Sequence, residues 1–373
     1  MIKRIIFVVV LLFSFVISTY ALDTSASSAV VMVAQTGEVV YSKNAHTRRS
    51  MASTTKIMTS LLAVENADLK KQIKVKEDMI KVEGTSMGLL DGDTVSMENL
   101  VYGMLLQSGN DAANVTAIML GGSIEKFSEL MNQRAREIGM NNTNFVTPSG
   151  LDDENHYSTA YDMALLGCEA IKNVEFRKIC SKTTARISYG NPPYMRTLSN
   201  HNRLLKSYEG CFGIKTGFTK KSGRCLVTAC QRDGITLVCV TLNDPDDWYD
   251  HKKMFDYGFE NVKNNQLDSL SFTVDVAGGQ KNKVNCNLLY TPSIQCVNNI
   301  EYSSRVLLDK TQFAPIKKGD ILGEVLYFNN GKEMFSVPIT ATEDVKTAVI
   351  EEKPKSFFEK VKEKIKNIFK GDK

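Results

Sequence analysis

Phe212-Gly-Ile-Lys-Thr-Gly-Phe-Thr219 opens the stretch of sequence that decides the fold. Two apolar runs, residues 223–230 and 235–242, follow it and flank Asp233-Gly234, a dipeptide typical of a two-residue hairpin turn. We therefore predict a β-hairpin over Gly223–Leu242, with Lys215–Thr219 forming the strand beside it.

Lys215, Thr216 and Gly217 give this strand a chemical character of its own. A lysine ammonium and a threonine hydroxyl can bind a terminal carboxylate. A glycine leaves room for an extended peptide to pair with the strand through its main chain. The alternative is an edge-strand lysine that only discourages aggregation.

Ser53-Thr-Thr-Lys56 stands at the start of a run with helical spacing, and helices are expected over about residues 53–176. Ser53 and Lys56 would lie on one face of the first helix. A serine hydroxyl needs a neighbouring base to act as a nucleophile, and lysine is such a base only when burial or a second cation lowers its pKa. Lys215 can be that second cation. The alternative is a helix-capping serine beside a solvated lysine.

Ser108-Gly-Asn110 separates two apolar helical runs. We predict a tight turn between buried helices, with Gly109 supplying backbone freedom, or simply an ordinary turn of common turn residues. Chance matches to the first two motifs occur at Ser123–Lys126 and Ser42–Asn44, whereas Lys-Thr-Gly occurs once. The order of the three motifs and the element that carries each one therefore indicate an acyl-transfer site with a lysine base.

The three motifs together resemble those of penicillin-binding proteins and class A β-lactamases. The surrounding sequence is more specifically similar to the D-alanyl-D-alanine carboxypeptidases, the low-molecular-mass penicillin-binding proteins. The resemblance implies an α/β (α+β) catalytic domain of the penicillin-binding and β-lactamase type, with an antiparallel sheet beside a helical cluster. The stretches that carry it are Ala52–Thr59, Ser108–Asn114, Pro148–Asp152, His156–Ala164 and Gly213–Thr219.

The resemblance assigns the chemical steps to particular residues. Ser53 attacks the carbonyl between the two terminal D-alanines of a peptidoglycan stem pentapeptide and becomes the acyl-enzyme, while Lys56 accepts its proton. Ser108 relays a proton toward the leaving amine and is held by Lys56, Lys215 and Asn110. Water then releases the shortened peptide.

The same resemblance places the substrate on the third motif. Lys215 and Thr216 bind the substrate carboxylate, and Gly217 belongs to the same binding strand. The backbone N–H groups of Ser53 and Phe218 form the oxyanion hole, a pair of preorganised donors. No metal and no other cofactor enters this scheme.

A β-lactamase is disfavoured by one departure from the class A pattern. Those enzymes carry a glutamate, in a Glu-x-x-Leu-Asn stretch, that activates the deacylating water. Residues 145–155 lack that pattern here. We therefore expect β-lactam antibiotics to act as covalent inhibitors that leave slowly.

Several polar residues near the motifs have open roles. Residues 152–154 are expected on a loop surface, and His156 either touches substrate or has a structural role. His201 or Arg203 can place a second cation near the carboxylate site, or either can be solvated at a strand end.

Four segments are expected along the chain. The basic start and apolar run before Ala21 resemble a secretory signal, so the protein is expected to be exported to the outer face of the cytoplasmic membrane, unless the segment stays as an anchor. The segments are a signal peptide at 1–21, the catalytic domain at 22–262, a β-rich domain at 263–350 and an amphipathic helix at 354–373.

The tail places its apolar residues on one helical stripe and carries seven lysines against three acids from residue 355 onward. This pattern indicates a helix that lies in the interface of an anionic membrane. The alternative is a helix that docks on its own domain or on a partner.

Composition agrees with an exported globular enzyme. A net charge of +4 on 373 residues is too small to indicate nucleic-acid binding. Of the eight cysteines, those in the hairpin are expected to be apolar fillers, and Cys286 and Cys296 are the candidates for a disulfide. The two-residue turn would pair Cys230 with Leu237 and Cys239 with Thr228.

Other functions stay open at this point. An endopeptidase or transpeptidase would keep the acyl-enzyme and change the donor or acceptor. A binding module would recognise peptidoglycan without turnover. A protein that only binds membranes leaves the three ordered motifs unexplained.

Overall fold

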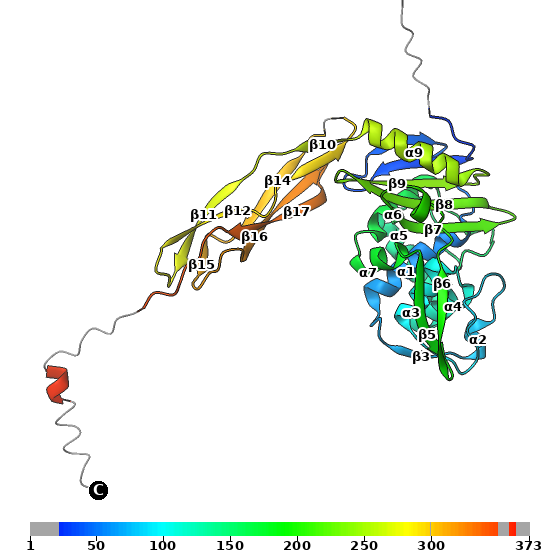
Figure 1. Ribbon diagram of the computed structural model, residues 1–373, viewed down its shortest axis with the longest axis horizontal. Coiled ribbons are helices and arrows are strands. Elements are labelled where there is room, and N and C mark those ends of the chain that lie inside the picture. The colour runs from blue at the N-terminus through cyan, green and yellow to red at the C-terminus, as the bar shows by residue number, and fades with distance from the viewer. Residues whose placement is uncertain (1–21, 299, 350–357, 363–373) are drawn as a thin grey trace, which may run out of the picture. The chain divides into compact units, whose positions relative to one another are not determined.

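A computed structural model of the chain describes residues 22–298, 300–349 and 358–362. The chain divides into two compact units, one ending at Val262 and the other beginning at Lys263 (Figure 1). The predicted signal peptide and most of the predicted tail helix lie outside the described residues, which include only one helical turn of that tail, at 358–362. In the part of the chain that is described, no helix is long and apolar enough to cross a membrane.

A five-stranded antiparallel sheet in the order β2-β1-β9-β8-β7 forms one layer of the first unit. The predicted hairpin is confirmed: β8 and β9 turn at Asp233-Gly234, with Cys230 opposite Leu237 and Cys239 opposite Thr228. The predicted neighbouring strand is also confirmed, as β7 at the edge of the sheet. The strands are β1 Ser28–Val33, β2 Val39–Lys43, β7 Cys211–Thr219, β8 Gly223–Arg232 and β9 Ile235–Leu242.

Helices cover both faces of this sheet because its strands are apolar on both sides. Helix α9 (Asp247–Asn261) packs on one face, where a Cβ at Gly258 would lie 2.6 Å from a Leu237 methyl carbon. Helix α6 (Ala160–Ala170) packs on the other, where a Cβ at Gly167 would lie 2.9 Å from a Val238 methyl carbon. Glycine at both positions lets the helices approach the sheet closely.

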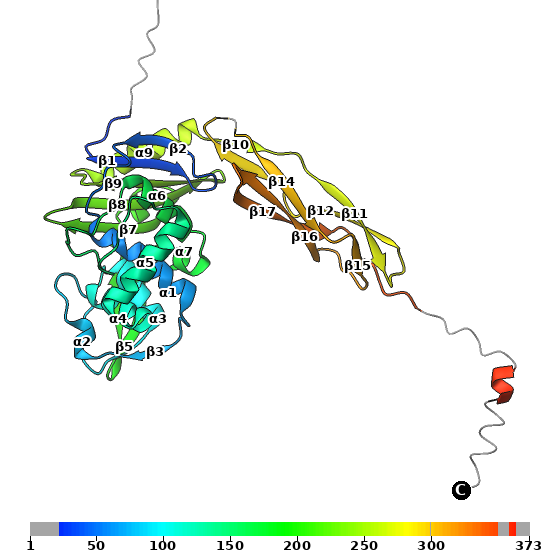
Figure 2. The same cartoon turned by 180° about the vertical axis from the view of Figure 1, so that it is seen from behind.

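A helical cluster lies on the α6 side of the sheet (Figures 1 and 2). Its central helix, α1, is buried from Lys56 to Ala63, so this helix has no solvent-facing side along its first two turns. The elements are the 3₁₀ turn η1 Ala52–Thr55, α1 Lys56–Asn66, α2 Glu77–Ile80, α3 Met97–Leu106, α4 Asn110–Gly121, α5 Ile124–Ile138, α7 Val174–Cys180 and α8 Leu204–Ser207.

A second sheet interrupts the region expected to be helical. Its order is β3-β4-β5-β6, and two of its strands fall between α1 and α3. Each of those strands is three residues long, which is too short for a periodic pattern, and β4 pairs with β5 from far along the chain. The strands are β3 Gln72–Lys74, β4 Thr94–Ser96, β5 Thr184–Gly190 and β6 Pro193–Ser199.

The second unit is built from β-strands, and its core consists mainly of alternating inward residues such as Val274, Val276 and Val337. A six-stranded sheet has the order β14-β16-β17-β12-β11-β15, and β10 pairs with β13. The candidate disulfide between Cys286 and Cys296 is not formed, because both residues are buried free thiols. The strands are β10 Lys263–Gln266, β11 Ser271–Ala277, β12 Lys283–Leu288, β13 Ser293–Cys296, β14 Ser303–Leu308, β15 Thr311–Phe313, β16 Ile321–Asn329 and β17 Lys332–Ala341.

Candidate active site

Ser53 and Lys56 lie where η1 leads into α1, with Ser53 on the turn and Lys56 as the first residue of the helix. The Lys56 Nζ atom lies 2.9 Å from Ser53 Oγ. It also lies 2.7 Å from Asn110 Oδ1 and 2.7 Å from the main-chain oxygen of Ser149. The first two motifs therefore meet at a single buried amine, to which a third segment contributes a carbonyl.

The partners of Lys56 fix the direction of its contact with Ser53 once the amine is neutral. A neutral amine has two N–H bonds and one lone pair. The amide oxygen of Asn110 and the carbonyl oxygen of Ser149 can only accept, so they take both N–H bonds. The lone pair is then left for the hydroxyl proton of Ser53. This arrangement suits a base that removes that proton.

Burial holds Lys56 toward the neutral form. Its side chain is completely buried, and burial, followed by the charge of Lys215, lowers its pKa well below the usual value. Asp111 opposes the shift but is the smaller cause. The sequence analysis predicted that Lys215 is a second cation that lowers the pKa of Lys56, and the structure agrees.

The turn between α3 and α4 contains the second motif, as predicted, but Gly109 is not the residue in the left-handed conformation. Ser108 has φ of +62°, whereas Gly109 has φ of −60°. Gly109 is needed for space, since a Cβ there would lie 2.7 Å from Asp111 Oδ1 and 3.0 Å from the Met87 amide nitrogen. The backbone freedom expected of Gly109 is therefore a wrong inference, and close packing takes its place.

Asn110 connects the catalytic lysine to the neighbouring loop. Its Oδ1 accepts from Lys56, and its Nδ2 donates to the main-chain oxygen of Glu83 over 2.7 Å. These two bonds fix which end of the amide faces the lysine. Ser108 lies beside this pair and is nearly buried. Among the described residues its hydroxyl has no hydrogen-bond partner, so the predicted contacts of Ser108 with Lys56, Lys215 and Asn110 are not formed.

Strand β7 brings the third motif against the serine. A Cβ at Gly217 would lie 3.0 Å from the Ser53 amide nitrogen and 3.1 Å from the Thr54 amide nitrogen, so β7 presses on η1 at this point. Lys215 is buried, and its Nζ donates to the Thr216 oxygen over 2.7 Å. Burial lowers the pKa of Lys215 to about 7. The side chain of Phe218 is 66% exposed to solvent.

An open pocket of about 570 Å³ joins the three motifs. Ser53, Ser108, Thr216, Gly217 and Phe218 all line it. The other lining residues are Thr85, Asn200, His201, Arg203, Arg224, Asp247 and Trp248.

Three side chains in this pocket are candidates for the second cation near the carboxylate site. Partial desolvation and the charge of Lys215 lower the pKa of His201, which disfavours the charged form of its imidazole. Arg203 is exposed at the pocket rim. Arg224, which the sequence analysis missed, lies in the pocket wall and donates to the buried Asp247 over 2.7 Å. Arg203 and Arg224 are therefore better candidates for this cation than His201.

His156 has a structural role behind the serine. Its Nδ1 accepts from the Val146 amide at 3.0 Å, so its Nε2 carries the hydrogen and donates to Thr55 Oγ1 over 2.8 Å. Burial lowers its pKa to about 4. Asp152 is exposed as expected, but its Oδ1 also accepts from Thr219 Oγ1 at 2.9 Å, which ties the loop to β7.

Two contributors were missed for different reasons. The Ser149 carbonyl is a main-chain group, and no side-chain signal marks it. Arg224 has a usable signal, because the short turn after Thr219 places it opposite Phe218 in the β7–β8 register. Aligning the two strands around that turn would have placed Arg224 beside the third motif.

A buried lysine amine against a serine hydroxyl, at the floor of an open pocket beside an edge strand, defines a serine acyl-transfer enzyme with a lysine base. The protein-family model described as D-alanyl-D-alanine carboxypeptidase matches residues 16–246. The model described as the C-terminal domain of penicillin-binding protein 5 matches residues 259–347. The chain belongs to the D-alanyl-D-alanine carboxypeptidase family of serine peptidases.

Individual relatives agree with this membership. The chain is 31% identical, over 88% of each sequence, to the D-alanyl-D-alanine carboxypeptidase DacF of Bacillus subtilis. It resembles the crystal structure of penicillin-binding protein 5 from Haemophilus influenzae with a TM-score of 0.62 at 29% identity, over 87% of this chain and 98% of that one. It resembles the DD-transpeptidase of Streptomyces K15 with a TM-score of 0.61 at 31% identity, over 64% of this chain and 98% of that one.

The predicted fold class and enzyme class are therefore confirmed. The protein is a serine-type D-Ala-D-Ala carboxypeptidase with a penicillin-binding catalytic domain, followed by an all-β C-terminal domain. β-Lactam binding is typical of this family.

Proposed function

We propose that Ser53 is the nucleophile and Lys56 the general base for removal of the terminal D-alanine from peptidoglycan stem pentapeptides. The observation that carries this proposal is the set of three partners around Lys56 Nζ, since two carbonyl acceptors direct the amine lone pair at Ser53. Lys56 takes the Ser53 proton while Oγ bonds to the carbonyl carbon between the two D-alanines.

The leaving amine needs a proton as its C–N bond breaks. Ser108 lines the same pocket as Ser53, and its hydroxyl is free of other hydrogen bonds among the described residues, so it can turn toward the departing nitrogen. We assign it the relay of the proton now held by Lys56, with Asn110 fixing the lysine. Water then attacks the ester carbonyl while Lys56 takes a water proton, and Lys56 returns that proton to Ser53 Oγ as the C–O bond breaks.

The substrate is proposed to lie along β7, which is an edge strand with one side unpaired in the sheet. An extended peptide can pair with that side through its main chain, and Gly217 keeps it close to Ser53. The backbone N–H groups of Ser53 and Phe218 then serve as the oxyanion hole. Lys215 and Thr216 bind the terminal carboxylate, and Arg224 or Arg203 adds the second cation.

The test is hydrolysis of a peptide ending in D-Ala-D-Ala by the full chain, followed by mass spectrometry. Loss of one alanine in the wild type, absent in Ser53→Ala, is the expected result. Cross-linked dimers would support the transpeptidase alternative. One of the similar solved structures, from Streptomyces K15, is that of a DD-transpeptidase. Folded wild-type protein that binds the peptide without reacting would contradict the enzyme proposal and support a binding module.

β-Lactams are proposed to acylate Ser53 and to leave slowly. In the described part of the chain no glutamate lines the pocket that contains Ser53, and the His156 imidazole is hydrogen-bonded to Thr55 and Val146. Intact mass spectrometry should record one stable penicilloyl adduct on the wild type and none on Ser53→Ala. An adduct that disappears within seconds would contradict this expectation.

The protein is further proposed to act on the outer side of the cytoplasmic membrane, with residues 1–21 as a cleaved signal and residues 354–373 as an interfacial helix. The support is the basic, amphipathic pattern of the tail. Deleting 354–373 should abolish sedimentation with vesicles that contain phosphatidylglycerol, while vesicles of phosphatidylcholine should bind neither form. Equal sedimentation of both forms would rule out the tail as the anchor.

A further inference from the structure

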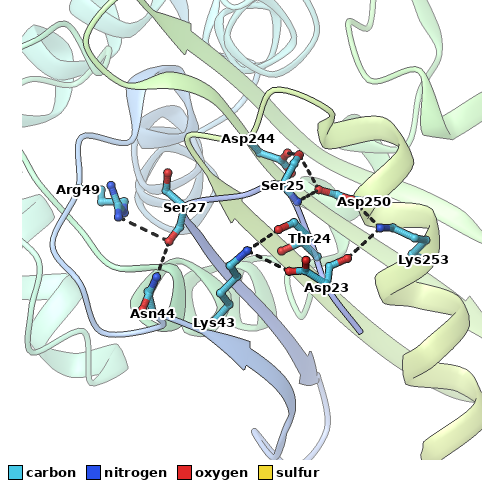
Figure 3. Close-up of polar contacts among 10 residues, drawn as sticks. All are labelled: Asp23, Thr24, Ser25, Ser27, Lys43, Asn44, Arg49, Asp244, Asp250 and Lys253. Atoms are coloured by element: carbon cyan, nitrogen blue, oxygen red, sulfur yellow. Dashed lines mark hydrogen bonds and ion pairs between the residues drawn. The ribbon is translucent and has the colours of Figure 1, made fainter. Parts of the chain in front are cut away.

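The segment Asp23–Ser27 is fastened to the catalytic unit at several points (Figure 3). Lys43 donates to Asp23 Oδ1 at 3.2 Å and to the Thr24 oxygen, and Lys253 donates to the Asp23 oxygen at 2.8 Å. The Ser27 amide donates to the Asn243 oxygen at 3.0 Å. A segment with no regular secondary structure is thus attached to β2, α9 and the loop after β9.

Ser25 is the centre of this attachment. Its amide donates to Asp250 Oδ2 over 2.6 Å. Its Oγ lies 2.7 Å from Asp244 Oδ1 and 2.8 Å from Asp250 Oδ2 (Figure 3). A serine hydroxyl has one proton to donate, so it cannot donate to both carboxylates at once. One of the two short contacts needs a proton from a carboxyl group.

Asp244 is the carboxyl that holds this proton. Asp250 is paired with Lys253 at 3.1 Å and accepts the Ser25 amide, so its charge is compensated. Asp244 is buried, and its Oδ2 has no hydrogen-bond partner among the described residues. Burial, assisted by the charge of Asp250, raises the pKa of Asp244 to about 6. The protonated Asp244 can donate to Ser25 Oγ, which then donates to Asp250.

Asp244 begins the loop that leads into the substrate pocket. Its amide donates to the Arg224 oxygen over 2.9 Å. Three residues later, Asp247 accepts from the Arg224 guanidinium at 2.7 Å, and the guanidinium carbon lies 5.5 Å from the centre of the Trp248 ring. Arg224, Asp247 and Trp248 all line the pocket that contains Ser53. The position of the loop therefore sets one wall of that pocket.

We propose that Ser25 is a positioning residue for substrate binding: by joining Asp244 to Asp250 it ties the loop of residues 243–246 to the start of helix α9 and thereby holds Arg224 and Trp248 in the pocket wall. This proposal rests on the proposed function, because it assigns the effect to the carboxypeptidase substrate. It adds a residue far in sequence from the three motifs.

The charged and titratable groups around the bridge decide how it responds to pH. Those nearby come from the N-terminal segment, from β2 and β8, from the loop and from α9. Burial lowers the pKa of His251 to about 3, so this group stays neutral in the range of interest. The groups are Asp23, Lys43, Arg224, Asp246, Asp247, Asp250, His251 and Lys253.

The sign follows from the raised pKa of Asp244. Below about pH 6 Asp244 keeps its proton and the bridge is complete, whereas above it both carboxylates are charged and the bridge weakens. The loop should then be best held under mildly acidic conditions.

Trp248 allows a direct test, because it is the single tryptophan of the chain. In the full chain, Ser25→Ala should change the tryptophan emission at pH 5 and should remove the change that the wild type shows between pH 5 and pH 7. Ser25→Thr, which keeps the hydroxyl, should behave as the wild type. Ser42→Ala, an exposed serine on β2, is the matched control.

The same variants give a kinetic test with a D-Ala-D-Ala peptide. The KM of Ser25→Ala should exceed that of the wild type about fivefold at pH 5, the effect of losing one hydrogen bond of ordinary strength, with kcat little changed. The ratio of the two KM values cancels effects of Lys215 and should fall toward one at pH 8. Equal KM values at pH 5 together with unchanged Trp248 emission would overturn the proposal. A ratio of KM values that is the same at every pH, together with a lower thermal stability of Ser25→Ala, would also overturn the proposal. A wild type that folds but releases no D-alanine would instead refute the proposed function.

Discussion

Replacing Asn110 by aspartate would test the neutral state of Lys56. The change places a carboxylate oxygen where Asn110 Oδ1 lies, 2.7 Å from Lys56 Nζ. At an effective dielectric constant of about 20, two opposite charges at about 4 Å attract by about 4 kcal/mol, and a shorter distance gives no less. That energy corresponds to about three pKa units. Lys56 would then be an ammonium near neutral pH, without the lone pair that takes the Ser53 proton, and acylation should fall by up to about a thousandfold.

The assay is the second-order rate of labelling by a fluorescent penicillin from pH 6 to pH 10. On the alkaline side, the Asn110→Asp rate divided by the Asn110→Ala rate should rise by up to about tenfold per pH unit, because this ratio cancels any loss of carboxylate binding at Lys215. Asn110→Ala is the matched control, because both variants lose the 2.7 Å bond from Nδ2 to the Glu83 oxygen but only the aspartate adds a charge. If the two variants share one pH profile, the argument for a neutral Lys56 is refuted.

Other predictions concern binding, space and stability. Because burial lowers the pKa of Lys215 to about 7, the KM for a peptide with a free terminal carboxylate should rise above pH 7, whereas that of its C-terminal amide should not; a parallel rise for both would contradict the assignment. Gly217→Ala should reduce penicillin labelling at least about tenfold, since its Cβ would lie 3.0 Å from the Ser53 amide nitrogen, and labelling at the wild-type rate would show that β7 moves aside freely. Burial lowers the pKa of His156 to about 4, so the free energy of unfolding should be fully retained above pH 6.5 and should fall by about 3 kcal/mol as the pH drops from 6.5 through 4. Urea unfolding of His156→Gln should lack this loss. The variant His46→Gln, at an exposed histidine, should keep it.

Local patterns predicted the parts of the fold that depend on local chemistry. The dipeptide Asp233-Gly234 specifies a two-residue turn, and once the turn is placed, the period of two residues determines every pair in the β8–β9 register. Ser53 and Lys56 are likewise only three positions apart, where the turn η1 leads into α1. In both cases the interacting residues are close in sequence, so their spacing contains the geometry.

The remaining features depend on residues far apart in the chain. Strands β3 and β4 are three residues long; β3 pairs with β4, and β4 pairs with β5, which comes some ninety residues later. The left-handed backbone of Ser108 and the close packing of Gly109 against Met87 are not indicated by any local preference of serine or glycine. The Ser149 carbonyl reaches Lys56 across 93 positions of sequence. Such contacts require the tertiary structure.

The two buried lysines raise a question of compatibility, because one must bind an anion while the other stays neutral. A substrate carboxylate at Lys215 would favour its ammonium form, and would also offset the field by which that ammonium lowers the pKa of Lys56. The order of causes resolves the conflict: burial is the largest cause of the shift at Lys56, and the charge of Lys215 is second. Substrate binding adds to that burial by displacing water from the pocket. Lys56 can therefore remain a base while Lys215 binds the carboxylate, and removing the Lys215 charge should raise KM more than it lowers the acylation rate at saturation.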